Sequence, residues 1–334
     1  DNQSNKYCNH IINDCNPKLL ISNKELKIET NTKLITNKVE ELNYYQNIDF
    51  IYNDISTLIY TSGTTGNPKG VMLSNENIIS NINGIQERFP DFKDKICLNI
   101  LPWAHIYSQT CELYYNLLNN NKIAISSSRE QFVKELKEIE PDVLYVVPRI
   151  LELIKAKVEY FNKPIIKYLL PIILKKIFGK NLKTMFVGGA KLESSTRDFF
   201  TNNGYIICEG YGCTELSPIA SLNHIENPRN EESIGKILNN VLVEIIEDEI
   251  QVSGPNVMLG YWNNEEETKK VLINGWLHTG DIGIIENSYL KITDRKKDIL
   301  ITPGGDNISP IKIENELVNL EFIDQAVVYG DSKP

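Results

Sequence analysis

The sequence has few of the features that mark metal-bound scaffolds or disulfide-linked domains. Six cysteines are spread over 334 residues, with no CxxC pair and no spacing typical of a metal site. A chain of this length can also bury a core without covalent cross-links. We therefore expect reduced thiols, which are typical of a cytoplasmic protein.

Positive charge is also scarce. The chain has 35 Lys and Arg against 44 Asp and Glu, which gives a formal net charge of −9 and a pI near 5.2. Proteins that bind the phosphate backbone of nucleic acids usually present a basic surface. The composition therefore argues against nucleic acid as a partner, and it gives no indication of the oligomeric state.

No hydrophobic run is long enough to cross a bilayer, and no secretory signal is visible. The nearest candidate, PIIKYLLPIILKKIF (164–178), is short and is interrupted by lysines and prolines. The wider stretch 163–183 is basic and apolar, which fits a segment lying peripherally on a membrane surface. A buried pair of helices broken at Pro171 is the alternative.

Short β-branched runs alternate with helical stretches over the first two-thirds of the chain. One such pair is DVLYVVP (142–148) with RILELIKAKVEYF (149–161), and another is TMFVG (184–188) with KLESSTRDFFTNN (191–203). This alternation predicts an α/β fold, in which helices cover a parallel sheet. From about Val241, short alternating strands and tight turns predict a small antiparallel β region.

The residues after Asp298 predict a further small unit. They contain ILITPGG, a helical stretch over about 309–319, and a last strand in AVVYGD (326–331). This is enough to begin a second domain but not to complete one.

The most informative segment is ISTLIYTSGTTGNPKGVML (55–73). It indicates a buried strand, a loop rich in Gly, Ser and Thr, and a helix that begins near Ser74 or Asn75. Backbone N–H groups and hydroxyls in such a loop can bind phosphate oxygens, and Lys69 can supply positive charge. A flexible Ser/Gly turn is the alternative. The segment is not a Walker A motif, because its lysine does not directly follow the second glycine.

The string YTSGTTGNPKGVMLS (60–74) resembles the phosphate-loop signature of the adenylate-forming (AMP-binding) superfamily, which includes acyl-CoA synthetases, peptide-synthetase adenylation domains and luciferases. Four further segments follow in that family's order: LPWAHIYSQ (101–109), EGYGCTELSP (209–218), GWLHTGD (275–281) and ITDRKKDILITPGGDNISPIKIE (292–314). Chance agreement of five ordered motifs is negligible. LPWAHIYSQTCELY and DRKKDILITPGGDNISP look most like the long-chain fatty acyl-CoA synthetases.

The resemblance implies a site for ATP and AMP, with Mg²⁺ as cofactor, and a fatty acid and coenzyme A as the other substrates. Catalysis is assigned to Lys69, His105, Thr214 and Glu215, with Glu215 as the Mg²⁺ ligand and Lys297 as a hinge. The residues assigned to ATP or AMP are Thr61, Ser62, Gly63, Thr64, Thr65, Gly66, Lys69, Gly189, Ala190, Glu209, Gly210, Tyr211, Gly212, Thr214, Asp281 and Arg295.

These residue types suit the chemistry. Glu215 offers a carboxylate to a hard cation, Asp281 can accept hydrogen bonds from ribose hydroxyls, and Tyr211 offers a ring to the base. Taken alone, Glu215 would be a solvated charge, Asp281 a turn residue, and 294–297 an exposed charge run. His105 alone would be a packed side chain. Because a fatty carboxylate is already ionised at neutral pH, we expect His105 to orient the acid and not to transfer a proton.

The implied reaction has two halves. The acyl carboxylate attacks the α-phosphorus of ATP and expels pyrophosphate, and the thiol of coenzyme A then displaces AMP. Family members rotate a small C-terminal domain between the halves, so we expect a large AMP-binding domain over 1–294 and a hinge with the start of a lid over 295–334. The family's lid lysine would fall beyond Pro334. The chain is therefore expected to be a fragment of impaired activity, with a natural truncation as the alternative.

Two other functions fit the same motifs. One is a different adenylate-forming ligase, acting on an aryl acid or an amino acid; the latter would need an acidic partner for the substrate ammonium, and none is identified. The other is a non-catalytic nucleotide-binding relative. Intact Lys69, Glu215 and Asp281 argue against it, because a protein released from catalysis would be free to lose them.

Overall fold

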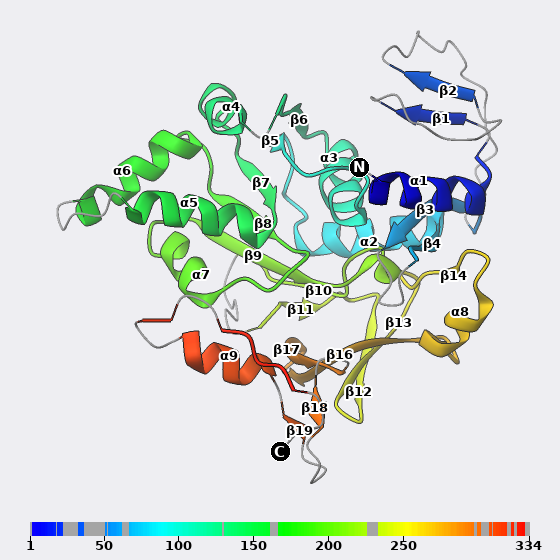
Figure 1. Cartoon of the computed structure of the whole chain (residues 1–334). Coiled ribbons are helices and arrows are strands. Elements are labelled where there is room, and N and C mark those ends of the chain that lie inside the picture. The colour runs from blue at the N-terminus through cyan, green and yellow to red at the C-terminus, as the bar shows by residue number, and fades with distance from the viewer. Residues whose placement is uncertain are drawn as a thin grey trace.

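The largest unit of the fold is a 12-stranded sheet with helices packed on its parallel half (Figure 1). The structure is a computed structural model, and it describes residues 2–17, 19–22, 33–36, 51, 53–61, 67–128, 130–160, 166–225, 233–296, 299–301, 307–308, 310–318, 322–323 and 326–330.

One half of this sheet is parallel. It runs in the order β9-β8-β7-β5-β6. The strands are β5 (Ile96–Asn99), β6 (Lys122–Ile125), β7 (Val143–Val146), β8 (Thr184–Val187) and β9 (Ile206–Tyr211). Every residue of β7 and β8 is buried, as expected where helices cover both faces of a parallel sheet.

The other half is antiparallel, as predicted from Val241 onward, but it belongs to the same sheet. β10 pairs antiparallel with β9, so hydrogen bonds run without interruption from one half to the other. At the β16–β17 hairpin, Asn287 and Ser288 have φ of 51° and 67°, which suits a tight two-residue turn. The antiparallel strands are β10 (Ser221–Leu222), β11 (Lys236–Ile237), β12 (Leu242–Ile246), β13 (Glu249–Ser253), β15 (Leu272–Ile273), β16 (Trp276–Glu286) and β17 (Tyr289–Arg295).

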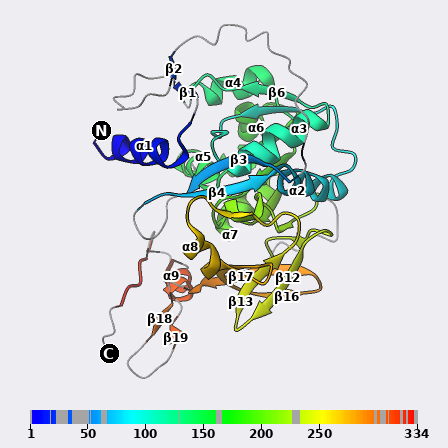
Figure 2. The ribbon, with the colours of Figure 1, turned by 90° about the vertical axis from the view of Figure 1, so that its right-hand side faces the viewer.

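A separate three-stranded sheet contains the residues on both sides of the Gly-rich loop. It consists of β3 (Ile55–Thr61), β4 (Lys69–Ser74) and β14 (Gly260–Tyr261), in the order β14-β4-β3. Figure 2 shows β3 and β4 between the helices and the antiparallel strands.

Helices pack on both faces of the parallel strands. Because side chains alternate along a strand, Leu144 and Val146 of β7 face one core cluster, and Val143 and Tyr145 face the other. The first cluster is closed by α4 to α7 and the second by α2, α3 and a π-helix. The helices are α1 (Asn2–Cys15), α2 (Asn75–Arg88), the π-helix Tyr107–Tyr114, α3 (Tyr115–Leu118), α4 (Phe132–Ile139), α5 (Pro148–Tyr160), α6 (Ile166–Phe178), α7 (Ser194–Thr201), the 3₁₀ turn Thr214–Leu216, α8 (Glu265–Val271) and α9 (Pro310–Val318).

The predicted start of α2 is confirmed. Ser74 is its N-cap: Ser74 Oγ accepts from Asn77 N at 3.1 Å, and Asn77 Oδ1 accepts from Ser74 N at 2.8 Å. This reciprocal pair satisfies two N–H groups that would otherwise lack partners.

Two expectations were wrong. α6 continues through Pro171 as one helix, because residues such as Leu174 and Phe178 pack it against α4 and the core. Residues 326–330 lie outside any strand, although their sequence favours one.

The described residues also include no helix that is long and apolar enough to span a membrane. Four short strands complete the description: β1 (Leu19–Ser22) with β2 (Lys33–Thr36), and β18 (Leu300–Ile301) with β19 (Asn307–Ile308).

Candidate functional site

Several of the sequence-predicted residues lie beyond the carboxyl ends of the parallel strands. Gly189 and Ala190 follow β8, with Gly189 at a φ of 84°, and Thr214 and Glu215 follow β9. The segment with His105 follows β5. In open α/β sheets, ligands bind at this edge.

Three predicted residues from distant motifs form one hydrogen-bonded group. The Tyr211 hydroxyl donates to Asp281 Oδ2 at 2.7 Å, and Arg295 Nε lies 3.0 Å from Asp281 Oδ1. Asp281 and Arg295 are direct partners across β16 and β17, which explains the second contact. Burial, followed by the charge of Asp281, raises the pKa of Tyr211, so its hydroxyl stays a donor at neutral pH.

The ends of the Gly-rich loop are brought together by strand pairing. Thr61, the last residue of β3, is the direct partner of Lys69, the first residue of β4. The loop residues Ser62, Gly63, Thr64, Thr65 and Gly66 lie outside the described residues, as does the predicted hinge Lys297. The two flanking strands therefore fix where the loop leaves and rejoins the sheet.

Lys69 and Glu215 meet around a tyrosine that the motifs did not indicate. The Tyr261 hydroxyl donates to Glu215 Oε1 at 2.9 Å, and Lys69 Nζ lies over the Tyr261 ring, 5.2 Å from its centroid. Lys69 also forms a close ion pair with Glu267 in α8. The structure thus joins the two predicted charges through Tyr261.

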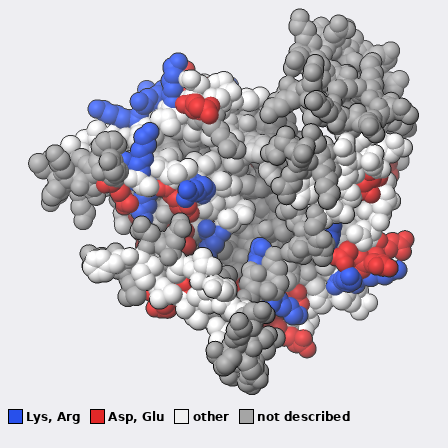
Figure 3. Space-filling model, in the orientation of Figure 1, with Lys and Arg blue, Asp and Glu red and all other residues white. Residues whose placement is uncertain are grey.

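Glu267 is held by two lysines. Hydrogen bonds from Lys270 and then Lys69 lower the pKa of Glu267 to about 2. Figure 3 shows the acidic and basic side chains that gather at the position of α8. Neither Tyr261 nor Glu267 could be found from local sequence, because the pairing of β14 with β4 brings them to the site.

Gly212, the second glycine of EGYGCTE, is required by the packing of the backbone around it. A Cβ on Gly212 would lie 1.8 Å from Pro218 O, so no other residue fits without moving the backbone. This close approach shapes the turn that positions Thr214 and Glu215. At Gly210 the nearest contact would be less severe, 3.1 Å from Leu222 Cδ1.

The Glu209 carboxylate pairs with an arginine of the same chain. Its Oε1 lies 3.2 Å from Arg197 Nη1, and both side chains are mostly buried. The prediction that Glu209 contacts the nucleotide stays a prediction, and its carboxylate has a structural role in tying α7 to β9.

His105 is exposed, in the turn before the π-helix Tyr107–Tyr114. Ser108 Oγ donates to His105 O at 3.1 Å, which stabilises the turn. Within the π-helix, Glu112 is fully buried and accepts from Asn99 Nδ2 at 2.5 Å. Burial raises the pKa of Glu112 to about 8. π-Helices are rare and often occur at functional sites.

The site fits Mg²⁺ as an ion shared between the Glu215 carboxylate and the phosphates of a bound substrate. Among the described residues, no group of three or more His, Cys, Asp or Glu side chains could hold a metal ion by itself. Mg²⁺ is often held by one or two carboxylates together with substrate phosphates and water. Glu215 is half-buried and accepts a hydrogen bond from the Tyr261 hydroxyl, which suits that kind of shared site.

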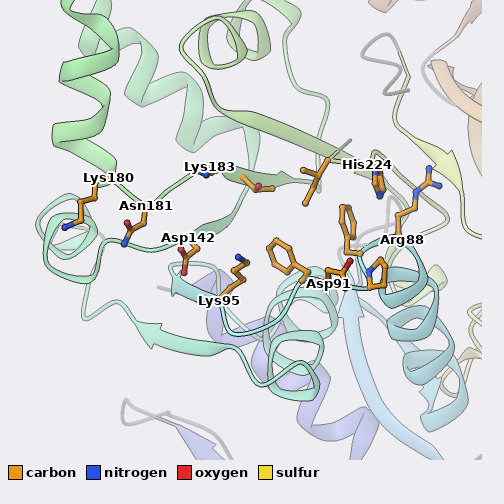
Figure 4. Close-up of a pocket in the computed structure, with 13 residues that line it drawn as sticks. Arg88, Asp91, Lys95, Asp142, Lys180, Asn181, Lys183 and His224 are labelled. Atoms are coloured by element: carbon orange, nitrogen blue, oxygen red, sulfur yellow. The ribbon is translucent and has the colours of Figure 1, made fainter. Parts of the chain in front are cut away.

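A separate cavity of about 510 Å³ lies at the amino ends of the strands (Figure 4). Lys95 and Asp142 directly precede β5 and β7, and Arg88 and His224 line its other end. None of the sequence-predicted site residues lines it. The cavity is therefore distinct from the predicted site.

The fold is that of the adenylate-forming enzymes, as predicted. O-succinylbenzoate coenzyme A synthetase (MenE) from Bacillus subtilis, solved in complex with AMP, matches with a TM-score of 0.77 at 22% identity, over 99% of this chain and 69% of that chain. An ATP-bound RpMatB-BxBclM chimera matches with a TM-score of 0.78 at 24% identity, over 95% of this chain and 66% of that chain. At these identities the likeness shows the fold.

Residues 1–262 match the family model described as AMP-binding enzyme, and the chain belongs to this family. Long-chain-fatty-acid–CoA ligase FadD15 from Mycobacterium bovis is 30% identical over 327 residues, which cover 84% of this chain and 53% of that protein. Long-chain-fatty-acid–CoA ligase from Bacillus subtilis is 32% identical over 298 residues, and the match covers 83% of this chain and 50% of that protein. Long chain acyl-CoA synthetase 6, peroxisomal, from Arabidopsis thaliana is 30% identical over 331 residues, and the match covers 84% of this chain and 46% of that protein. The chain spans about half the length of these relatives.

Proposed function

We propose that this chain is part of an ATP-dependent, AMP-forming acyl-CoA synthetase that activates a long-chain fatty acid. The observation that carries the proposal is the linked group of Tyr211, Asp281 and Arg295, assembled from three separate motifs. The fatty acid is favoured because curated relatives at about 30% identity have that substrate in their names.

In this proposal the nucleotide is held at its ribose and its phosphates. Asp281 accepts from the ribose hydroxyls, and Arg295 donates beside it. Lys69 lies at the end of the Gly-rich loop, where its ammonium can approach phosphate oxygens. Glu215 would hold Mg²⁺, which neutralises phosphate charge when bound.

The adenylation step concentrates negative charge at the α-phosphate. Lys69 and the Thr214 hydroxyl would stabilise this charge as the carboxylate attacks and pyrophosphate leaves. His105, exposed at the edge of the site, would orient the acid. Attack by the thiol of coenzyme A on the acyl-adenylate then releases AMP.

The proposal includes a division of labour between two domains. Residues 1–294 would form the large domain with the nucleotide site, and residues 295–334 the hinge and the beginning of a lid. Lys297 would be the pivot, because hinge residues absorb the backbone rotation between states.

The test is pyrophosphate release by the full-length protein with ATP and a panel of acids. Long-chain fatty acids should support release, and added coenzyme A should convert the adenylate to thioester. Glu215→Ala should abolish release, with an unchanged circular dichroism spectrum, because a half-buried carboxylate contributes little to the core.

Other results would support other functions. A preference for aryl acids or amino acids would indicate a different adenylate-forming ligase. Binding of ATP without pyrophosphate release for any acid would indicate a non-catalytic relative, and it would overturn the proposal.

A further inference from the structure

Tyr261 lies between the two charged side chains that the sequence assigns to phosphate and Mg²⁺. Its hydroxyl donates to Glu215 Oε1 at 2.9 Å, and Lys69 Nζ lies 5.2 Å from its ring centroid. The residue is only 7% exposed and is part of the core. One buried side chain therefore contacts a carboxylate and an ammonium from different parts of the chain.

The backbone on both sides of Tyr261 is hydrogen-bonded to the segments that carry Lys69 and Glu215. After it, Trp262 N donates to Gly70 O at 2.7 Å, as part of the pairing of β14 with β4. Before it, Met258 N donates to Glu215 O at 2.9 Å. The tyrosine is thus held at a defined distance from both the strand that begins at the phosphate loop and the turn after β9.

The two contacts have different chemistry. The hydroxyl donates to one oxygen of Glu215, which restrains the orientation of the carboxylate. The ring face attracts the Lys69 ammonium, because an aromatic ring is negative at its face.

We propose that Tyr261 is a positioning residue for the nucleotide site. Its hydroxyl orients Glu215 toward Mg²⁺, and its ring holds the Lys69 ammonium where it can approach the phosphates of ATP. The inference rests on the proposed function and adds to it the side chain that connects the metal-binding and phosphate-binding groups.

Tyr261→Phe tests the hydroxyl alone, since it keeps the ring. In the full-length protein, we expect the Mg²⁺ concentration that half-saturates ATP binding to rise about 10- to 100-fold, the usual effect of removing a hydrogen bond to a metal ligand. The affinity for ATP in EDTA should not change, because the contact between the ring and Lys69 remains. Isothermal titration calorimetry measures both quantities without turnover. Tyr261→Leu should weaken ATP binding in EDTA as well.

Tyr205→Phe is the matched control. Tyr205 is also 7% exposed, but it packs against Phe178 and Phe200 in the other core cluster. It should leave the Mg²⁺ requirement at the wild-type value. The comparison separates the hydroxyl at the site from the general effect of removing a buried tyrosine hydroxyl.

The outcomes distinguish this inference from the proposed function. An unchanged Mg²⁺ requirement in Tyr261→Phe, or an equal rise in Tyr205→Phe, overturns the positioning role. Wild-type protein that binds ATP with Mg²⁺ but releases no pyrophosphate overturns only the proposed function, since the titration still decides the role of Tyr261. Wild-type protein that binds no ATP with Mg²⁺ overturns both.

Discussion

At the scale of single residues, Asp281 shows how one carboxylate can organise a site. It accepts from the Tyr211 hydroxyl through Oδ2 and pairs with Arg295 through Oδ1. It is also almost fully buried. Its charge is therefore compensated by Arg295 and a hydroxyl in a fixed geometry, as a buried charge requires.

Asp281→Asn should weaken AMP binding about tenfold to a hundredfold. The amide has nearly the same shape, but it replaces one acceptor with a donor that faces the donors of Tyr211 or Arg295. A hydrogen bond to a charged group contributes roughly 1.5–3 kcal/mol, which sets the size of the effect. Calorimetric titration with AMP measures the change.

Asp142→Asn is the control for this substitution. The Asp142 carboxylate accepts from Ile96 N at 2.8 Å, at the opposite edge of the sheet. AMP affinity should be unchanged in this variant. Wild-type affinity in Asp281→Asn would show that Asp281 does not contact the nucleotide.

At the scale of elements, the π-helix Tyr107–Tyr114 is unusual because it buries a carboxyl group. Glu112 accepts from Asn99 Nδ2 and is fully buried. Burial raises its pKa to about 8, from a value near 4.5 in the unfolded chain. Between these two values the folded protein keeps a proton that the unfolded chain has lost.

Glu112→Gln should therefore flatten the pH dependence of stability. In the wild type, the free energy of unfolding should fall as pH rises from about 5 to 8, by at most about 1.4 kcal/mol per pH unit from this group. Glutamine resembles the protonated acid and can still accept from Asn99, so the variant should keep the fold and lose this slope. Urea denaturation at pH 6, 7 and 8 measures the difference.

Glu135→Gln supplies the comparison. Hydrogen bonds from Ser126 and Ser127 lower the pKa of Glu135, so it is ionised in both states above pH 5. Its substitution should leave the slope between pH 5 and 8 intact. A slope in Glu112→Gln equal to that of the wild type would mean that Glu112 is ionised in the folded protein.

At the scale of the whole molecule, α6 packs one face on the core and presents another to solvent. Leu174 is buried, whereas Leu169 and Ile172 are 43% and 53% exposed beside the exposed Lys175 and Lys176. Apolar and basic side chains on one outer face are typical of helices that lie on an anionic membrane surface. The outer face of α6 is therefore where we expect the predicted membrane contact.

We expect the full-length protein to float with vesicles that contain anionic lipid. Lys175→Glu with Lys176→Glu should weaken this partition by at least about thirtyfold, because each lysine near such a surface contributes roughly 1 kcal/mol. Lys134→Glu with Lys137→Glu, on the exposed face of α4, is the matched control and should float like the wild type. Equal flotation of all three proteins would rule out contact through α6.

Much of the fold and site followed from local patterns. The buried strands β7 and β8, the antiparallel strands after Val241, and the capped start of α2 were predicted, because strand propensity and capping depend on neighbouring residues. The five ordered motifs also indicated the family, which the match over residues 1–262 confirms. They named Tyr211, Asp281 and Arg295 as partners at a nucleotide.

Only the tertiary structure decided how these pieces combine. The pairing of β10 with β9 makes one sheet of two predicted β regions, and the core contacts of Leu174 keep α6 helical through a proline that local rules treat as a break. The pairing of β14 with β4 brings Tyr261 between Lys69 and Glu215. Such contacts join residues far apart in the chain, so they depend on the packing of the whole molecule and leave no local pattern in the sequence.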